Sequence, residues 1–182
     1  LRLAVNRQQI VDQVYDGRAI VGNDIFSPFD PAYSAHLPQR EQDIEAARAL
    51  LAEAGFPDGL TVEMTAAPIQ PTADRQNEVL IQQAAAAGFD IRFNRVDTAT
   101  YYGPGYGTYP LSLSYWGLLS IFDQAAFTIV NDAPYNATKW QDDAYDALYQ
   151  QAIRTVDDEE RTALIAQMQA DATQARRILS AP

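Results

Sequence analysis

The first part of the chain carries apolar residues at helical spacing. In LRLAVNRQQIVDQVYDG, residues 1–17, they recur close to every third or fourth position, and Gly17 is placed as a helix stop. No capping residue is evident at the start of this helix. The segment 43–55, DIEAARALLAEAG, repeats the helical pattern up to Gly55, and a Pro-Asp-Gly turn follows it. These two segments predict two helices.

Two later segments alternate apolar and polar residues, as half-buried strands do. LTVEMTAAP and FDIRFNRVD flank an apolar helical run that Thr72 can cap and that ends at Gly88. The expected inward positions are Leu60, Val62, Met64, Phe89, Ile91, Phe93 and Val96. Strand, helix and strand across residues 60–97 have the length of a βαβ unit. The pattern therefore predicts an α/β fold, a sheet with helices on its faces.

A third strand is predicted at LSLSYW, residues 111–116, with Ser112, Ser114 and Trp116 on one face. The alternation then stops. A short helix near residues 124–130, a Pro-Tyr-Asn turn, and helices over residues 143–153 and 158 to about 179 are expected next. Thr155 is the expected cap of the last helix.

Two other segments lack a regular period. Residues 22–42 hold prolines and scattered aromatic residues, which favours an ordered loop. Residues 97–110, rich in glycine and tyrosine, lack the Lys-Ser/Thr of a phosphate-binding loop and precede a strand where a dinucleotide motif would follow one. A tight loop is the preferred interpretation.

Composition narrows the possible chemistry. The 182 residues suit one sizeable core, so a single domain over residues 1–182 is expected. The chain has no cysteine and a single histidine, His36, which leaves little for disulfides, thiolate or imidazole metal sites, or a catalytic triad. Its formal charge of −11, without a dense Lys/Arg cluster, disfavours nucleic acid and anionic membranes as partners. No metal and no cofactor are expected.

Several motifs in order resemble the family 5 extracytoplasmic solute-binding proteins, the peptide, nickel and oligosaccharide receptors of ABC importers. AVNRQQIVDQVYDGRA is similar to an early segment of that family, and ARALLAEAGFPDGLTVE to its most repeated one. AAAAGFDIRF, the strand ending in Trp116, WQDDAYDALYQQA and DDEERTALIAQMQADA continue the resemblance through nearly the whole chain.

The resemblance implies the fold, function and location of the protein. It implies a type II periplasmic-binding-protein-like lobe, with a mixed β-sheet flanked by helices. It maps residues 1–182 to the C-terminal lobe of a two-lobed receptor, with the N-terminal lobe preceding them. It further implies a periplasmic receptor without enzymatic activity, usually monomeric, that binds a peptide or small solute and delivers it to a membrane-embedded ABC permease.

The resemblance also nominates ligand-binding residues. In the family, the strand ending in tryptophan leads into the cleft between lobes, so Trp116 is expected as a cleft wall beside Tyr115 and Gly117, with packing in the core as the alternative for Trp116. Peptide-binding members carry an aspartate three positions after this tryptophan, where this chain has Leu119. Asp123 either replaces that acid as an ammonium ligand or caps the following helix.

Two further residues, Asn136 and Trp140, match a family segment near the cleft. For Trp140, packing against its own helix is an equal alternative to ligand contact.

Three other functions stay open at this point. Because Leu119 departs from the peptide-binding pattern, an oligosaccharide or opine-like ligand is an alternative to a peptide. An effector-sensing domain of a transcription regulator is a second alternative, since such domains resemble family 5 lobes. A hydrolase with paired carboxylates among the acids from Asp123 to Asp146 is the third, although their spacing does not require them to converge.

Overall fold

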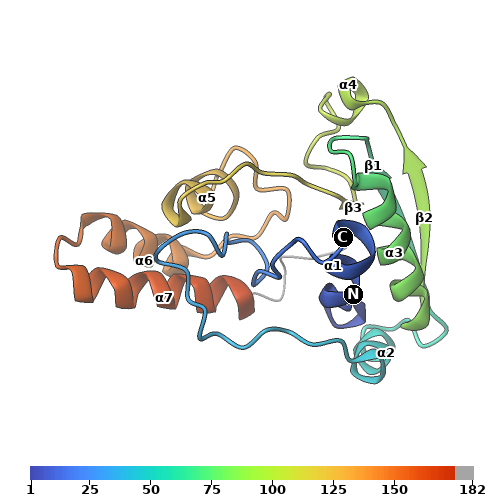
Figure 1. Ribbon diagram of the computed structural model, residues 1–182, viewed down its shortest axis with the longest axis horizontal. Helices are drawn as coiled ribbons and strands as arrows, with labels where there is room; N and C mark the ends of the chain where they lie inside the picture. Colours follow the sequence, from blue (N-terminus) through green and yellow to red (C-terminus); the bar gives the residue numbers. More distant parts are fainter. Residues whose placement is uncertain (175–182) are drawn as a thin grey trace. The chain divides into compact units, whose positions relative to one another are not determined.

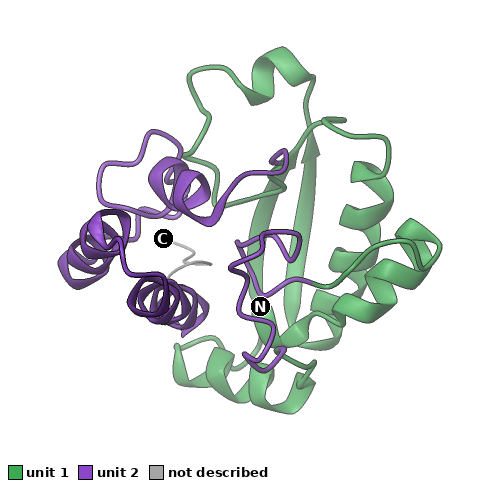
Figure 2. Ribbon diagram, turned by 60° about the vertical axis from the view of Figure 1, so that its left-hand side comes forward, with its two compact units in different colours: residues 1–21, 40–115, 181–182 green, residues 22–39, 116–180 purple. Residues whose placement is uncertain are grey.

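The computed structural model describes residues 1–174, which form two compact units. Unit 1 contains residues 1–21 and 40–115, and unit 2 contains residues 22–39 together with the described residues from 116 onward (Figure 2). Each unit has its own hydrophobic core. The described residues therefore form two separately packed cores, where the sequence suggested one. The chain passes between the two units at three points among these residues.

Unit 1 is an α/β unit whose elements follow the predicted order (Figure 1). They are a short 3-10 helix Arg2–Ala4, α1 Arg7–Tyr15, α2 Ile44–Glu53, β1 Leu60–Ala66, α3 Ala73–Ala86, β2 Phe89–Arg95, α4 Thr98–Tyr101 and β3 Leu111–Ser112. The three strands form a parallel sheet in the order β2-β1-β3. The βαβ unit expected from residues 60–97 is confirmed as β1, α3 and β2.

The alternation of β1 and β2 places their apolar residues on one face of the sheet. Leu60 is in register with Phe89 and Val62 with Ile91, and these four belong to the core of unit 1. Ala84 and Ala87, from α3 and its C-terminal end, pack against the same face. Phe93 departs from the expected pattern, because 40% of its side chain is exposed.

The start of the chain differs from the sequence-based expectation. The regular helix begins only at Arg7, and the Asn6 side chain caps it by accepting a hydrogen bond from the Gln9 N–H at 2.9 Å. The prediction of an uncapped helix was wrong because residues 2–4 form a separate 3-10 turn. The side chain of buried Gln83, on α3, contacts the residue that caps α1, because its oxygen accepts a hydrogen bond from the Asn6 N–H at 3.0 Å.

Unit 2 is helical. It contains α5 Ile121–Thr128, α6 Asp143–Arg154 and α7 Asp158–Gln174, together with the irregular segment 22–39. Asp157, and not Thr155, caps α7 by accepting from the Glu160 N–H at 2.9 Å, which corrects the predicted cap. The Thr155 hydroxyl instead donates to the Gln151 carbonyl of α6. The expected end of the last helix near residue 179 lies outside the described residues.

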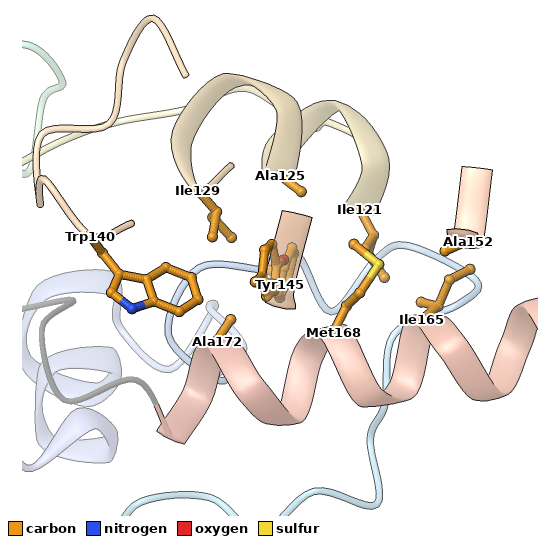
Figure 3. Close-up of a cluster of buried hydrophobic side chains, with 10 residues drawn as sticks. Ile121, Ala125, Ile129, Trp140, Tyr145, Ala152, Ile165, Met168 and Ala172 are labelled. Atoms are coloured by element: carbon orange, nitrogen blue, oxygen red, sulfur yellow. The ribbon is translucent and has the colours of Figure 1, made fainter. Parts of the chain in front are cut away.

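The core of unit 2 is formed where the three helices meet (Figure 3). Ile121 and Ala125 of α5, and Ile129 just after it, face Met168 and neighbouring residues of α7, with Tyr145 of α6 between them. Segment 22–39 contributes to the same core through Phe26. This core fixes the direction in which α5 presents its remaining side chains.

Candidate functional site

The carboxyl edge of the sheet in unit 1 has the topology of a ligand site. From β1 the chain runs through α3 to β2 on one side, whereas β3 lies on the other side of β1. Open α/β sheets bind ligands at such a switch point, outside the carboxyl ends of the strands. The ends of β1 and β2 are held together there, because the Val96 N–H donates to the Ala66 carbonyl at 3.0 Å.

The strand predicted over residues 111–116 is much shorter in the structure. Ladder pairing with β1 includes only Leu111 and Ser112. The Leu113 carbonyl accepts a hydrogen bond from the Tyr101 hydroxyl instead, which takes this residue out of the ladder. The shared face predicted for Ser112, Ser114 and Trp116 is therefore wrong, since regular alternation ends at Ser112.

Two predicted site residues, Tyr115 and Gly117, lie in the exposed segment that follows β3. Tyr115, the last residue of unit 1, is 57% exposed. Gly117 is also exposed, and a Cβ atom there would meet nothing within 4 Å. The backbone of Gly117 is not in the left-handed region, so this position does not require glycine for its conformation.

Trp116 lies in unit 2 within a cluster of three aromatic rings, called here the Trp116 cluster. Its indole stacks on Phe127 of α5, with centroids 6.2 Å apart and an interplanar angle of 13°. Tyr135 meets Trp116 edge-on at 5.4 Å and Phe127 at 6.3 Å. Phe127 and Tyr135 are 39% and 46% exposed, and Trp116 is half-buried. The cluster therefore offers aromatic surface to solvent within unit 2.

Sequence reasoning did not single out Phe127 and Tyr135. Phe127 lies in an apolar helix whose other face forms the core, and Tyr135 lies in a turn. A backbone bond from the Tyr135 N–H to the Phe127 carbonyl, 3.0 Å long, fixes the turn against the end of α5. The only signal in the sequence was that the predicted turn contains an aromatic residue, Tyr135, and this does not show whether the ring lies at the surface or in the core.

Asp123 takes part in a capping interaction at the start of α5. The Ser120 hydroxyl accepts from the Asp123 N–H at 3.1 Å and donates to its carboxylate at 2.7 Å. Ser120, and not Asp123, is thus the N-cap, and α5 begins three residues earlier than the sequence suggested. Asp123 is exposed and supports this helix start, and its proposed contact with a ligand ammonium stays a prediction.

Asn136 and Trp140 occupy a tight turn in unit 2. The Asn136 amide donates to the Trp140 carbonyl at 2.7 Å, and its oxygen accepts from the Thr138 hydroxyl at 2.8 Å. Both residues are 9% exposed, and the indole of Trp140 points into the helical core, 5.1 Å from the Tyr145 ring (Figure 3). These contacts give both residues a structural role, and their proposed ligand contact remains untested.

Other candidate chemistry is sparse in residues 1–174. His36 is exposed in segment 22–39. This part of the chain holds no group of three or more His, Asp or Glu side chains placed to bind a metal ion. Within the same residues, no helix combines the length and the apolar composition that crossing a membrane requires.

The fold is that of the periplasmic binding proteins. A dipeptide binding protein from Pseudoalteromonas sp. SM9913, solved with Met-Leu, matches 94% of the chain with a TM-score of 0.83 and 19% identity; the match covers 36% of that protein. The periplasmic binding protein DppA from Helicobacter pylori, solved with the peptide STSA, matches the same share of each chain with a TM-score of 0.82 and 21% identity. The predicted α/β fold class is thereby confirmed, but the sheet of the described residues is parallel and not mixed as the resemblance implied.

The family follows from the sequence comparison. The chain belongs to the bacterial extracellular solute-binding proteins, family 5 (Middle), whose model matches residues 1–163. It is similar to the di/tripeptide-binding protein 1 of Pseudomonas aeruginosa (strain UCBPP-PA14), with 30% identity over 178 residues. That match covers 93% of this chain and 33% of the relative, so the chain spans about a third of the length of the curated relatives it matches.

Proposed function

We propose that this chain is the C-terminal ligand-binding lobe of a two-lobed substrate-binding component of an ABC importer, with peptides or related small solutes as ligands. The observation that carries the proposal is the Trp116 cluster, three aromatic rings partly open to solvent, of which Trp116 follows the last strand of the sheet by four residues. Membership of the extracellular solute-binding family and similarity to di/tripeptide-binding proteins support the transport function.

The proposed mechanism is binding without a chemical step. Aromatic rings supply large contact areas with few rotatable bonds, which suits recognition of apolar side chains at a low entropic cost. Contacts that form only when two lobes close on the ligand shift the equilibrium toward the closed form. The closed receptor, a periplasmic monomer in this proposal, would then dock on the membrane-embedded permease.

The contacts of the acidic residues support binding over hydrolysis. Asp142 caps α6 by accepting from the N–H groups of Ala144 and Tyr145 at 2.9 and 3.1 Å. Asp146 accepts from the Asn131 N–H at 2.9 Å, and Asp143 from its side-chain amide at 2.8 Å. Together with the Ser120 interaction of Asp123, these bonds give Asp123, Asp142, Asp143 and Asp146 local structural partners, which account for acids at these positions without a hydrolytic role.

The test uses the complete protein to which this chain belongs. Purified protein is screened by thermal shift with dipeptides, tripeptides and oligosaccharides at 1 mM, and each stabilising ligand is measured by calorimetry. We expect peptides to raise the melting temperature, and Trp116→Ala to weaken their binding by about tenfold or more. Trp116→Phe, which keeps an aromatic ring, should lose less.

The control is Phe29→Ala, which removes a 68% exposed ring outside the Trp116 cluster and should leave affinity unchanged. Stabilisation by oligosaccharides alone would replace the peptide assignment with a sugar receptor. No stabilisation by any of these ligands would refute the transport proposal. Unchanged peptide affinity in Trp116→Ala would remove the Trp116 cluster from the site.

A further inference from the structure

Unit 1 contains a second aromatic surface, which the site described above does not include. The segment 102–110, called here the tyrosine loop, joins α4 to β3 and contains Tyr102, Tyr106 and Tyr109. The sequence predicted a tight loop here. The structure shows a loop fixed by several specific contacts.

Two buried or half-buried tyrosines anchor the loop. Tyr101, 1% exposed at the end of α4, stacks on Tyr109 with centroids 5.5 Å apart. The Tyr109 hydroxyl donates to the Tyr101 carbonyl at 3.1 Å. Gly105 packs so closely on this ring that a Cβ atom would stand 3.2 Å from the Tyr109 oxygen. The loop is therefore held in place before any ligand arrives, which reduces the entropic cost of binding.

The anchored loop presents Tyr102 to solvent. This side chain is 50% exposed, meets Tyr101 edge-on at 5.0 Å and lies 5.3 Å from the half-buried Tyr106 ring at an angle of 45°. Partial burial and the neighbouring Tyr106 raise the pKa of Tyr102, so its phenol is neutral at neutral pH. Tyr102 and Tyr106 thus form a pair of inclined aromatic faces.

The loop also lies at the edge of the sheet where a ligand is expected. It follows the carboxyl end of β2 through α4, and β3 pairs with the carboxyl half of β1, at Met64 and Thr65. The bond from the Tyr101 hydroxyl to the Leu113 carbonyl ties α4 to the segment leaving β3. Leu113 is two residues before Tyr115, a separation of about 7 Å in an extended chain.

We propose that Tyr102, supported by Tyr106, is a specificity-determining contact for an aromatic side chain of the bound peptide. This inference rests on the proposed function, because it assigns a preference to the same ligand class. An aromatic side chain suits the inclined pair, since aromatic rings favour edge-to-face and offset arrangements over aliphatic contacts of similar area. An alanine side chain at the same ligand position would reach neither ring.

The experiment compares three matched dipeptides on the complete protein. Affinities for Ala-Phe, Phe-Ala and Ala-Ala are measured by calorimetry for the wild type, Tyr102→Ala and Tyr102→Phe. We expect Tyr102→Ala to bind the better phenylalanine-containing dipeptide about tenfold more weakly and Ala-Ala within about twofold of the wild type. Tyr102→Phe retains the ring and should retain the preference. Phe56→Ala, which removes a 42% exposed ring before β1 at the opposite end of the sheet, is the matched control and should change neither affinity.

The outcomes separate this inference from the proposed function. If the wild type binds none of the three dipeptides and no other peptide at 1 mM, the peptide assignment fails and the inference fails with it. If the wild type binds them and Tyr102→Ala changes both ligand types equally or neither, only the inference is overturned. Melting temperatures of all variants, expected within about 2 °C of the wild type for exposed positions, show whether a lost affinity reflects unfolding.

Discussion

Replacing Gln169 with leucine should loosen the attachment of segment 22–39 to the helices of unit 2. Gln169, on α7, is 2% exposed. Its side-chain N–H groups donate to the Ala32 carbonyl and the Ser34 hydroxyl, both at 2.9 Å, and its oxygen accepts from the Ser34 N–H at 2.8 Å. One buried side chain thus pairs groups 135 residues away in the sequence.

The magnitude follows from the groups that would lose their partners. Leucine has a similar volume and makes no hydrogen bond, so the Ser34 N–H, in a residue that is 6% exposed, would be left unpaired at about 1–3 kcal/mol. The half-buried Ala32 carbonyl can hydrogen-bond to water instead, which reduces its contribution to the destabilisation. The apolar surface that the leucine buries offsets a further part of the lost stability. We expect Gln169→Leu to lower the free energy of unfolding of unit 2 by about 2–3 kcal/mol.

The assay is urea unfolding of the 182-residue chain followed by tryptophan fluorescence. Both tryptophans, Trp116 and Trp140, lie in unit 2, so their emission reports this unit. Gln167→Leu is the matched control, because Gln167 is exposed on the same helix and its side chain, within residues 1–174, bonds only Asp171 one turn away. It should change stability by no more than about 0.5 kcal/mol.

A second variant tests the reasoning through its pH dependence. Gln169→Glu keeps an acceptor for the Ser34 N–H but directs a carboxylate at the Ala32 carbonyl oxygen. Burial should raise the pKa of this glutamate above its unfolded value of about 4.3, so its destabilising effect should grow as pH rises through the folded pKa. Equal stability of Gln169→Leu and Gln167→Leu, or a pH-independent Gln169→Glu, would refute the reasoning.

Three further substitutions test packing, each by thermal unfolding followed by circular dichroism. Gly59→Ala should destabilise the chain by about 2 kcal/mol or more, because φ is +105° and the new Cβ would stand 2.6 Å from the Gly88 carbonyl oxygen. Gly117→Ala, in open space, is its control, and an equal effect of the two would contradict the clash. Asn77→Leu should leave stability unchanged or raise it, since the amide is 1% exposed and neither of its polar atoms has a partner among the described residues. Tyr145→Phe should behave likewise, because its buried hydroxyl is also unpaired in that part of the chain. A loss above about 1 kcal/mol in either variant would show that these groups are hydrogen-bonded.

Local pattern was sufficient to predict the α/β core of unit 1. The alternation of Leu60, Val62 and Met64 indicated the buried face of β1, and all three contribute to the core. Gly55 and Gly88 end α2 and α3 with positive φ values of 93° and 94°, as helix-stop glycines do. These features depend on neighbours within a few residues, so the sequence displays them directly. The ordered motifs that resembled family 5 carried the same kind of local information, and the family is confirmed.

The aromatic sites were decided by tertiary structure. Trp116 and Trp140 look alike in sequence, yet one is half-buried beside Phe127 and the other points into the core of unit 2. The predicted third strand ended early because the Tyr101 hydroxyl, twelve residues away, bonds the Leu113 carbonyl.

The physical reason is that hydrophobic periodicity records whether a side chain is buried on average, whereas its partner is set by packing between distant segments. The sequence alone therefore determined the order of most elements, the fold class and the family of this protein. Only the tertiary structure decided that Phe127 and Tyr135 join Trp116, and that the tyrosine loop presents Tyr102, because these arrangements depend on contacts that no local spacing encodes.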